Sequence, residues 1–298
     1  MEFSTKIYSR IGELMQGFLS DGSAFMVSGF SSRRWFSEAR VEEGDGAPGA
    51  GLPPKAARAL ALLLALMEDR KGGQQVMRAT QGKGTQAKGG MDGLRVGLRG
   101  NIPPGKGLSS SSTDILSVLC VVNDYLAAGL SSGELYQVAA QVEPTDPCLS
   151  DDILLFYQHS GVPCRSIGLP PMSLLYFDAE PGRVINTETV QRPWTPGVGK
   201  FFDWLLFSFL RAAEAGDYEA LFERVTASAE YNQTVIGLPR FADYCRLARD
   251  TRSGLMVAHS GTIAGLLTRP EDCAELQARL QAATGVPVYS EHYSQILF

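Results

Sequence analysis

The stretch NIPPGKGLSSSSTD (residues 101–114) has Pro and Gly in its first half, four consecutive serines in its second half, and an apolar segment after it. Glycine lets the backbone pass close to a ligand, because it has no Cβ and tolerates positive φ. Serine is a frequent N-cap, so the serine run predicts the start of a helix. A Gly-rich turn that opens a helix presents free N–H groups and the positive end of the helix dipole, which favours phosphate binding.

Side chains of the same stretch could contribute to a nucleotide site. Lys106 supplies a positive charge, and a serine hydroxyl can share a Mg²⁺ ion with nucleotide phosphates. The stretch is not a Walker A loop, because Gly107 follows Lys106 where that loop has Ser or Thr, and it lacks the Gly-x-Gly-x-x-Gly spacing. An ordinary polar loop before a core helix is the alternative.

The composition is that of a globular protein. Of 298 residues, 44% are hydrophobic and 20% are charged, which allows one large domain or two smaller ones that share a cleft. The net charge is −5 and the chain has no long basic run, so nucleic-acid binding is not expected.

Membrane insertion and export are not expected either. The longest apolar candidate, residues 56–67, contains Arg58 and is shorter than the roughly 18 residues that a spanning helix needs. Polar residues interrupt any signal-peptide core near the N-terminus. The five cysteines lack Cys-x-x-Cys spacing, so disulfide frameworks and zinc sites are not expected, and a reducing cytoplasm fits.

Hydrophobic patterning predicts an α+β fold in which strands and helices alternate. We expect strands at residues 3–10, 23–30, 75–79, 94–98, 153–157, 173–177, 254–258 and 286–289. We expect helices at residues 54–70, 112–128, 131–142, 201–215, 217–231, 239–250 and 270–283. The Gly- and Lys-rich residues 82–93, with Lys83 and Lys88, form either a hairpin tip or a rim over the nucleotide. Residues 161–171 link two halves.

Three other stretches carry candidate functional side chains. Residues 12–17 (GELMQG) contain two polar side chains, although a strand bulge or turn would explain the glycines equally well. Residues 143–148 (EPTDPC) hold an acidic residue between two prolines, on a stiff turn that cannot be helical. Residues 259–265 form a second small-residue loop that leads into an apolar stretch; its histidine could equally be structural.

The 101–114 stretch resembles the phosphate loop of the GHMP small-molecule kinases, whose pattern is Pro-Pro-x-x-Gly-Leu-Gly-Ser-Ser-Ala. Residues 103–108 fit it without a gap, residues 110–111 fall on its serine pair, and Ser109 replaces the glycine that precedes this pair. A variant of this pattern is typical of the L-threonine kinase branch, which acts in cobalamin side-chain synthesis. Three residues match that variant: Lys106, Asp114 and Ile115.

The resemblance implies a two-half GHMP kinase fold with the active site in the cleft between the halves, here residues 1–165 and 166–298. It implies ATP and Mg²⁺ as cofactors. The nucleotide would contact Pro104, Gly105, Lys106, Gly107, Leu108, Ser109, Ser110, Ser111 and Ser112. Mg²⁺ would be held by Ser111 and Glu143. Asp114 would either pair with the helix dipole or lie near the metal or Lys106.

Phosphoryl transfer needs positioning, charge neutralisation and a carboxylate that can accept the proton of the alcohol. In the Glu-Pro-Thr-Asp stretch, which resembles the same branch, Asp146 is the candidate carboxylate, with Lys106 as its catalytic partner. Glu143 is then a metal contact or a neighbour of one. A pair of solvated acids is the alternative reading. Asp151 and Asp152 compete for the role of base, but adjacent acids before an apolar strand are often only solvated.

Two further motifs of the L-threonine kinase branch imply the substrate contacts. In Gly-Glu-Leu-x-Gln-Gly, Glu13 would meet a substrate ammonium and Gln16 its hydroxyl or carboxylate. In Gly-His-Ser-Gly-[Ser/Thr]-x-x-Gly-Leu, whose first glycine is Ala258 here, the implied contacts are His259, Ser260, Gly261 and Thr262. The flanks of Glu13 lack the Pro-Ala-Ser-Cys and Cys-Pro-Val runs of the branch, which bears on substrate identity.

The sequence therefore predicts a kinase that phosphorylates the hydroxyl of a small amino acid, with L-threonine as the best candidate. Homoserine or a related hydroxy acid is the first alternative. A sensor that keeps the kinase fold without turnover is the second, and it is motivated by Ser109. We expect ATP and a hydroxy amino acid as ligands, no nucleic acid and no membrane, and leave a homodimer open.

Overall fold

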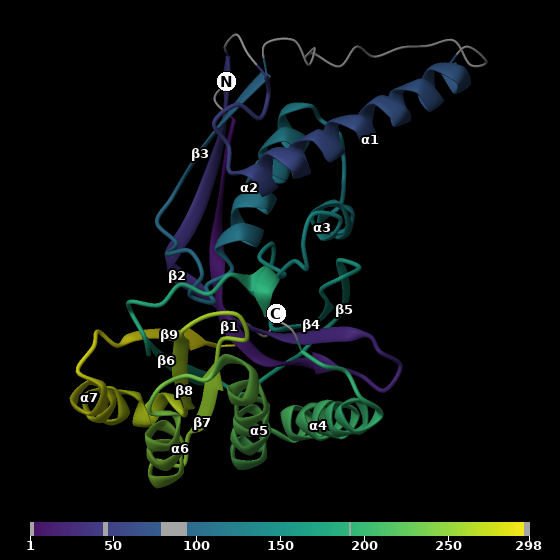
Figure 1. Cartoon of the computed structure of the whole chain (residues 1–298). Coiled ribbons are helices and arrows are strands. Elements are labelled where there is room, and N and C mark those ends of the chain that lie inside the picture. Colours follow the sequence, from purple (N-terminus) through teal and green to yellow (C-terminus); the bar gives the residue numbers. More distant parts are fainter. Residues whose placement is uncertain (1–2, 44–46, 79–93, 191, 295–298) are drawn as a thin grey trace.

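Two long antiparallel strands form the spine of the molecule. In the computed structural model, which describes residues 3–43, 47–78, 94–190 and 192–294, β1 (Ser4–Phe18) and β2 (Ala24–Glu43) pair from end to end. Their register shifts between Tyr8 and Arg10 and again between Glu13 and Met15. Such bulges bend a strand and re-aim its side chains. Figure 1 shows the hairpin passing from the upper to the lower part of the molecule.

The other strands of the first sheet pair with the two ends of β2. At the upper end, β3 (Leu94–Gly100) pairs with β2. At the lower end, β4 (Leu154–Tyr157) pairs with β2 and β5 (Val162–Ser166) pairs with β4. All these pairs are antiparallel.

Three helices cover one face of the upper part of this sheet: α1 (Pro54–Arg78), α2 (Ser110–Tyr125) and α3 (Ser132–Ala140). The helix α2 packs directly on β1 and β2, and α1 and α3 pack on α2. Its apolar side chains are buried nearly all round, as expected of a helix between a sheet and other helices. A capping box begins α3, because Ser131 and Glu134 exchange hydrogen bonds with each other's backbone amides.

The second sheet has the strand order β7-β8-β6-β9 and is antiparallel throughout. Its strands are β6 (Met172–Asp178), β7 (Gly254–Val257), β8 (Ile263–Thr268) and β9 (Tyr289–Tyr293). The helices that accompany it are α4 (Pro196–Ala215), α5 (Tyr218–Ile236), α6 (Phe241–Asp250) and α7 (Cys273–Thr284). Short 3₁₀ turns, η1 (Thr187–Thr189) and η2 (Pro270–Asp272), lie in the connections.

One hydrophobic core joins the two sheets. Ile11 and Phe25 of the hairpin share it with Leu174 of β6 and Phe202 of α4. Figure 1 shows the lower end of the hairpin lying across the second sheet and its helices. The division into domains at residue 165 therefore stays a prediction, since the hairpin contributes to packing on both sides of it.

The α+β fold class is confirmed, and several boundaries are corrected. The predicted strand at residues 75–79 is wrong for residues 75–78, because α1 continues to Arg78. Adding a residue to an existing helix costs less than starting a new element. Residues 79 and 82–93, with Lys83 and Lys88, lie outside the described part of the chain. The last strand begins at Tyr289, three residues later than predicted.

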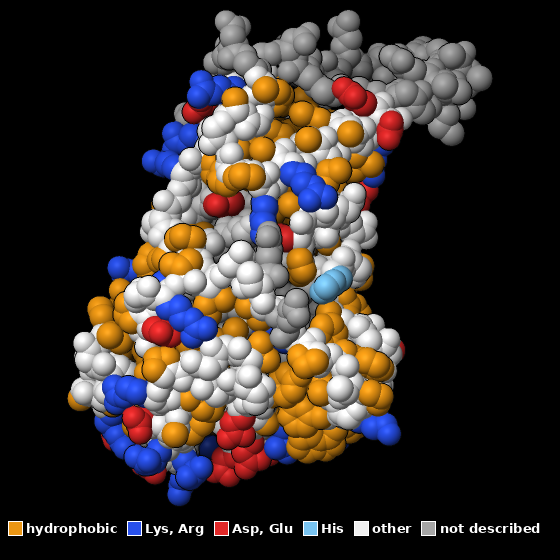
Figure 2. Space-filling model, in the orientation of Figure 1, with side chains coloured by type: hydrophobic (Ala, Val, Ile, Leu, Met, Phe, Trp, Pro, Cys, Tyr) orange, Lys and Arg blue, Asp and Glu red, His pale blue; other side chains and the backbone are white. Residues whose placement is uncertain are grey.

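The described helices include none that is long and apolar enough to cross a bilayer. On the surface, hydrophobic side chains gather over α4, at the lower right of Figure 2, where Trp204 and Phe207 are exposed.

Candidate active site

A cleft of about 560 Å³ lies where the 101–114 stretch meets β1 and the connections from the rest of the chain. Its lining includes Glu13 and Gln16 of β1, residues 107–112, the acidic pair Glu143 and Asp146, and Ser260. Residues that are more than two hundred positions apart in the sequence thus share one cavity.

The backbone of the glycine loop has a left-handed conformation at three positions. Gly105 has a φ of 65°, Gly107 a φ of 82° and Ser109 a φ of 52°. A Cβ at Gly107 would overlap with the Cβ of Ala258, so the loop can pass that residue only as glycine. Ser109 adopts the conformation that its glycine counterpart in the family pattern would adopt without strain.

The first turn of α2 opens into the cleft. The helix begins at Ser110, two residues earlier than predicted, and among the described residues its N-cap Ser109 makes no side-chain capping bond. A serine therefore occupies the N-cap position, as the serine run predicts, but within the described part of the chain its side chain does not cap the helix. The first amides of a helix have no carbonyl one turn earlier to bind. The amides of residues 110–112 and the hydroxyls of Ser110 and Ser111 thus remain available at the positive end of the helix dipole, which suits an anion.

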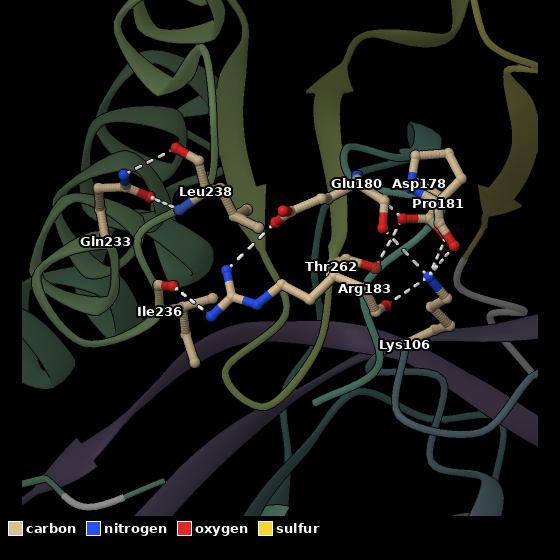
Figure 3. Close-up of polar contacts among 9 residues, drawn as sticks. All are labelled: Lys106, Asp178, Glu180, Pro181, Arg183, Gln233, Ile236, Leu238 and Thr262. Carbon is tan, nitrogen blue, oxygen red and sulfur yellow. Dashed lines mark hydrogen bonds and ion pairs between the residues drawn. The ribbon is translucent and has the colours of Figure 1, made fainter. Parts of the chain in front are cut away.

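Lys106 is held outside the lining of this cleft. Its Nζ lies 2.8 Å from Asp178 Oδ2 and donates to the carbonyls of Glu180, Pro181 and Arg183 at 3.2, 2.9 and 2.7 Å. Figure 3 shows the ammonium pointing into the turn that follows β6. The Lys106 side chain is buried, and four oxygen partners occupy its ammonium. These contacts link the glycine loop to the second sheet, and phosphate binding by Lys106 stays a prediction that they do not support.

The turn at residues 259–262 packs against the backbone of the glycine loop at Lys106. The amides of Thr262 and Ile263 donate to the Lys106 carbonyl at 3.1 and 3.0 Å. A Cβ at Gly261 would overlap with the backbone of Lys106. The Thr262 hydroxyl donates to Asp178 at 2.6 Å. Of the four predicted contacts in this turn, only Ser260 lines the cleft.

Three carboxylates and one lysine meet in the cleft. Glu143 accepts from Lys55 Nζ at 2.7 Å. Asp146 accepts from the amide of Gln158 at 3.2 Å, and its backbone N–H donates to Ser112 Oγ at 3.1 Å. Burial, and next the charge of Glu13, raise the pKa of Asp146 to about 7. A carboxylate with this pKa is suited to exchange a proton near neutral pH.

Glu13 belongs to a buried polar network. Its Oε2 accepts from both the amide and Nδ1 of His259, each at 3.0 Å. Burial lowers the pKa of His259, so the ring is neutral with its hydrogen assigned to Nδ1. Arg192 donates to the His259 carbonyl and, at 3.0 Å, to Asn232. His259 therefore orients Glu13 from outside the lining.

Arg192 lines the cleft on the side of Glu13. Its Nε is buried and has no hydrogen-bond partner among the described residues. Burial lowers the pKa of Arg192, and the charge of Glu13 acts in the opposite direction. An unpaired buried donor is costly unless a ligand satisfies it. The guanidinium is therefore suited to a carboxylate or another small anion.

The structure brings together most of the predicted site residues. The cleft is lined by Glu13, Gln16, Gly105, Gly107, Leu108, Ser109, Ser110, Ser111, Ser112, Glu143, Asp146 and Ser260. Outside its lining lie Pro104, Lys106, His259, Gly261 and Thr262. Asp114 accepts from Ser37 Oγ at 2.6 Å and lies beyond the first turn of α2, so its predicted pairing with the dipole there is wrong. The carboxylates of Asp151 and Asp152 are exposed outside the lining.

Sequence reasoning missed five polar residues of the cleft: Lys55, Gln158, His159, Thr187 and Arg192. Lys55 opens a helix, Gln158 and His159 follow β4, and Arg192 lies in an irregular connection. None of them belongs to a local motif, so only the chain's tertiary path could reveal them.

The donor set of the cleft fits Mg²⁺. Hydroxyl and carboxylate oxygens come from Ser111, Ser112 and Glu143, and Mg²⁺ prefers oxygen ligands that it shares with phosphates and water. In the described part of the chain, His, Cys, Asp and Glu side chains form no cluster of three or more that could hold a metal alone. A metal here would therefore depend on the nucleotide for part of its coordination.

Comparisons with known proteins show what the chain is similar to. The model of the GHMP kinases N terminal domain matches residues 74–158. L-threonine kinase from Salmonella typhimurium is 25% identical over 205 residues, which are 63% of this chain and 64% of that protein. L-threonine kinase from Citrobacter freundii is 26% identical over 58% of this chain and 62% of that protein. The match thus spans less than two thirds of either relative.

Solved structures extend the fold match to nearly the whole chain. Streptococcus pneumoniae phosphomevalonate kinase aligns over 98% of this chain and 100% of its own, with a TM-score of 0.68 and 13% identity. Homoserine kinase from Cytophaga hutchinsonii aligns over 98% of this chain and 94% of its own, with a TM-score of 0.65 and 12% identity. The structure described as MDDEF in complex with MVAPP, AMPPCP and magnesium aligns over 99% of this chain and 100% of its own, with a TM-score of 0.61 and 14% identity. Identities this low show the fold alone.

The chain has the fold of these small-molecule kinases, and its residues 74–158 match the N-terminal domain of the GHMP kinases. It is similar to L-threonine kinases over about 60% of its length.

Proposed function

We propose that this protein is an ATP-dependent kinase that phosphorylates the hydroxyl of a small amino acid. The single observation that carries the proposal is the joint position of two features in one cleft. The uncapped start of α2 is suited to phosphates, and Asp146, whose pKa is raised to about 7, is suited to accept a proton.

The triphosphate would lie against residues 107–112, where amides and hydroxyls of α2 are available. Ser111 and Glu143 would hold Mg²⁺, which neutralises phosphate charge when bound. Asp146 would accept the hydroxyl proton, and the oxygen would then form a bond to the γ-phosphorus while the bond from that phosphorus to the bridging β–γ oxygen breaks and ADP leaves. Gln158 orients the Asp146 carboxylate through the bond at 3.2 Å. The chain thus supplies positioning and charge, as phosphoryl transfer requires.

The charges of the cleft support an amino acid as the acceptor. Glu13 offers a carboxylate to an ammonium, and Arg192 offers a guanidinium to a carboxylate. A substrate with both charges and a short hydroxyl side chain would match them. L-threonine fits this description and is the acceptor suggested by the two L-threonine kinase relatives. Homoserine fits the same charges, and a homoserine kinase shares the fold.

The test is ADP release from Mg-ATP with L-threonine, L-homoserine, L-serine and the control 3-hydroxybutyrate, which lacks the amino group. We expect turnover with at least one amino acid and none with the control. Product identification by ³¹P NMR should show a phosphate ester. Mg-ATP binding without ADP release on any hydroxy amino acid would refute the kinase and favour the sensor.

A further inference from the structure

Arg10 is a buried charge in β1 that no part of the proposed reaction uses. Its side chain has no exposed surface. All its hydrogen bonds go to backbone carbonyls. Nε donates to Pro147 at 3.2 Å, Nη1 to Gly29 at 3.0 Å and Asp151 at 3.5 Å, and Nη2 to Ser150 and, at 2.7 Å, to Asp152. Each of the five N–H groups of the guanidinium thus has an acceptor.

Four of the five acceptors belong to one segment, residues 147–152, which follows Asp146 directly. Pro147 is both the first residue that Arg10 holds and the next residue after Asp146. Its ring fixes φ, so little rotation separates the held segment from Asp146. On the other side, Ser112 accepts from the Asp146 amide at 3.1 Å. The backbone of Asp146 is thus held on both sides of its Cα, at its own amide by Ser112 and at the following residue by Arg10.

Arg10 binds the backbone carbonyls of this segment and not the side-chain carboxylates of Asp151 and Asp152. Their side chains are exposed, and within the described residues Arg10 forms no ion pair at a salt-bridge distance. The segment is therefore held by its carbonyls, which wrap around the guanidinium. Removing the guanidinium would leave several buried carbonyls unsatisfied.

We propose that Arg10 is a positioning residue for the phosphoryl transfer: it holds the 147–152 segment on β1 and thereby fixes where the Asp146 carboxylate points. The inference rests on the proposed function of Asp146. Arg10 and Glu13 lie on the same strand, on either side of Gly12. One strand therefore fixes both the carboxylate offered to the ammonium and the turn that carries the base.

An arginine is required by this geometry. Its planar fork reaches five carbonyls, whereas the ammonium of a lysine has three N–H groups and a single centre. Arg10→Lys keeps the charge and most of the length, and it removes the fork. Misplacing a catalytic group by about 1 Å can cost roughly 100-fold in rate.

The experiment compares Arg10→Lys with Arg224→Lys. Arg224 is a partly buried arginine of α5 that donates to Ser208 at 3.0 Å outside the cleft, so it controls for the loss of an arginine contact. For Arg10→Lys we expect kcat to fall about 10- to 100-fold, with the KM for ATP changed less than about threefold. We expect faster amide hydrogen exchange in residues 148–152. Arg224→Lys should keep both the wild-type kcat and the wild-type exchange in that segment.

If Arg10→Lys does not fold, Pro147→Gly takes its place. This variant keeps Arg10 and frees the joint between the held segment and Asp146, and it should lower kcat in the same way. A folded Arg10→Lys or Pro147→Gly protein with wild-type kcat would overturn the inference. If wild type itself phosphorylates no acceptor, the proposed function fails, and unchanged exchange in residues 148–152 of Arg10→Lys would independently refute the hold of Arg10 on the segment.

Discussion

At the scale of single residues, the environment of Asp146 decides what the cleft can do. Its carboxylate is surrounded by protein on most sides, and Glu13 adds a negative charge nearby. Both effects disfavour the ionised form, so the pKa rises. Hydrogen bonds from Ser109 and Gln158 act in the opposite direction, but less strongly than burial. The result is a carboxyl group whose pKa lies at about 7, as a general base for the proposed reaction would need.

The pH dependence of catalysis follows from this pKa. Because the base must be deprotonated to accept the hydroxyl proton, kcat/KM should rise with pH and level off above about 7. In Glu13→Gln the neighbouring charge is gone, so the pKa of Asp146 should fall and the rise should move to lower pH. The measurement is kcat/KM for the acceptor from pH 5 to 9. A profile that is flat across pH 7 in wild type would contradict the assignment.

Removing the carboxylate tests the same residue directly. Asp146→Asn keeps the size and can still accept from Gln158, but it cannot take a proton. We expect kcat to fall about 100- to 10,000-fold, the usual contribution of a general base. Mg-ATP affinity, measured by calorimetry, should remain within about tenfold. Asp151→Asn is the matched control, since that side chain is exposed. Full loss of activity in Asp151→Asn, with activity kept in Asp146→Asn, would show that Asp151 and not Asp146 is the base.

At the scale of elements, the glycine loop and the 259–262 turn form one interlocked unit. The loop can pass Ala258 only because Gly107 has no Cβ, and the turn can approach Lys106 only because Gly261 has none. Two amide bonds to the Lys106 carbonyl join them. The loop's shape is therefore set as much by a turn 150 residues later as by its own sequence.

Gly107→Ala should break this unit. Alanine at a φ of 82° is strained, and its Cβ would overlap with Ala258. We expect a loss of more than about 1 kcal/mol of unfolding free energy and weakened ATP binding. Gly22→Ala is the matched control, because Gly22 has a φ of 84° and a Cβ there would meet no atom of the described chain within 4 Å. Equal losses in the two variants, by urea unfolding, would show that the close approach is unimportant.

At the scale of the whole molecule, Lys106 connects the two sheets. It leaves the loop after β3 and binds Asp178 at the end of β6, together with three carbonyls of the following turn. Arg183 of that turn donates to the Ile236 carbonyl at the end of α5 at 3.0 Å. The same connection then supplies Thr187 and Arg192 to the cleft. The position of one wall of the cleft thus depends on a buried lysine.

Lys106→Met should therefore act mainly on stability. It leaves Asp178 and three carbonyls without their cation, so the unfolding free energy should fall by about 3 kcal/mol. Asp178→Asn should have an effect of the same sign, because it removes the other partner of the pair. Urea unfolding of both variants, with Mg-ATP calorimetry on the folded proteins, gives the measurement. A large loss of ATP affinity in Lys106→Met alone, with unchanged stability, would favour the phosphate role instead.

The sequence alone was sufficient where the signal is local. The α+β class, the capping box at Ser131 and a glycine loop that leads into α2 follow from turn chemistry and periodicity, which act within a few residues. The position of Asp146 on a stiff turn followed from its two flanking prolines in the same way.

Only the tertiary structure decided which side chains face the cleft. Lys106 and Asp178 are 72 positions apart, and Arg10 reaches the segment after Asp146 across about 140 residues. Side-chain direction depends on packing and on available partners, and a buried ammonium or guanidinium turns toward whatever oxygens the fold supplies. For this reason the motif at residues 101–114 could single out Lys106, but only the structure showed that its ammonium binds Asp178 and the turn after β6.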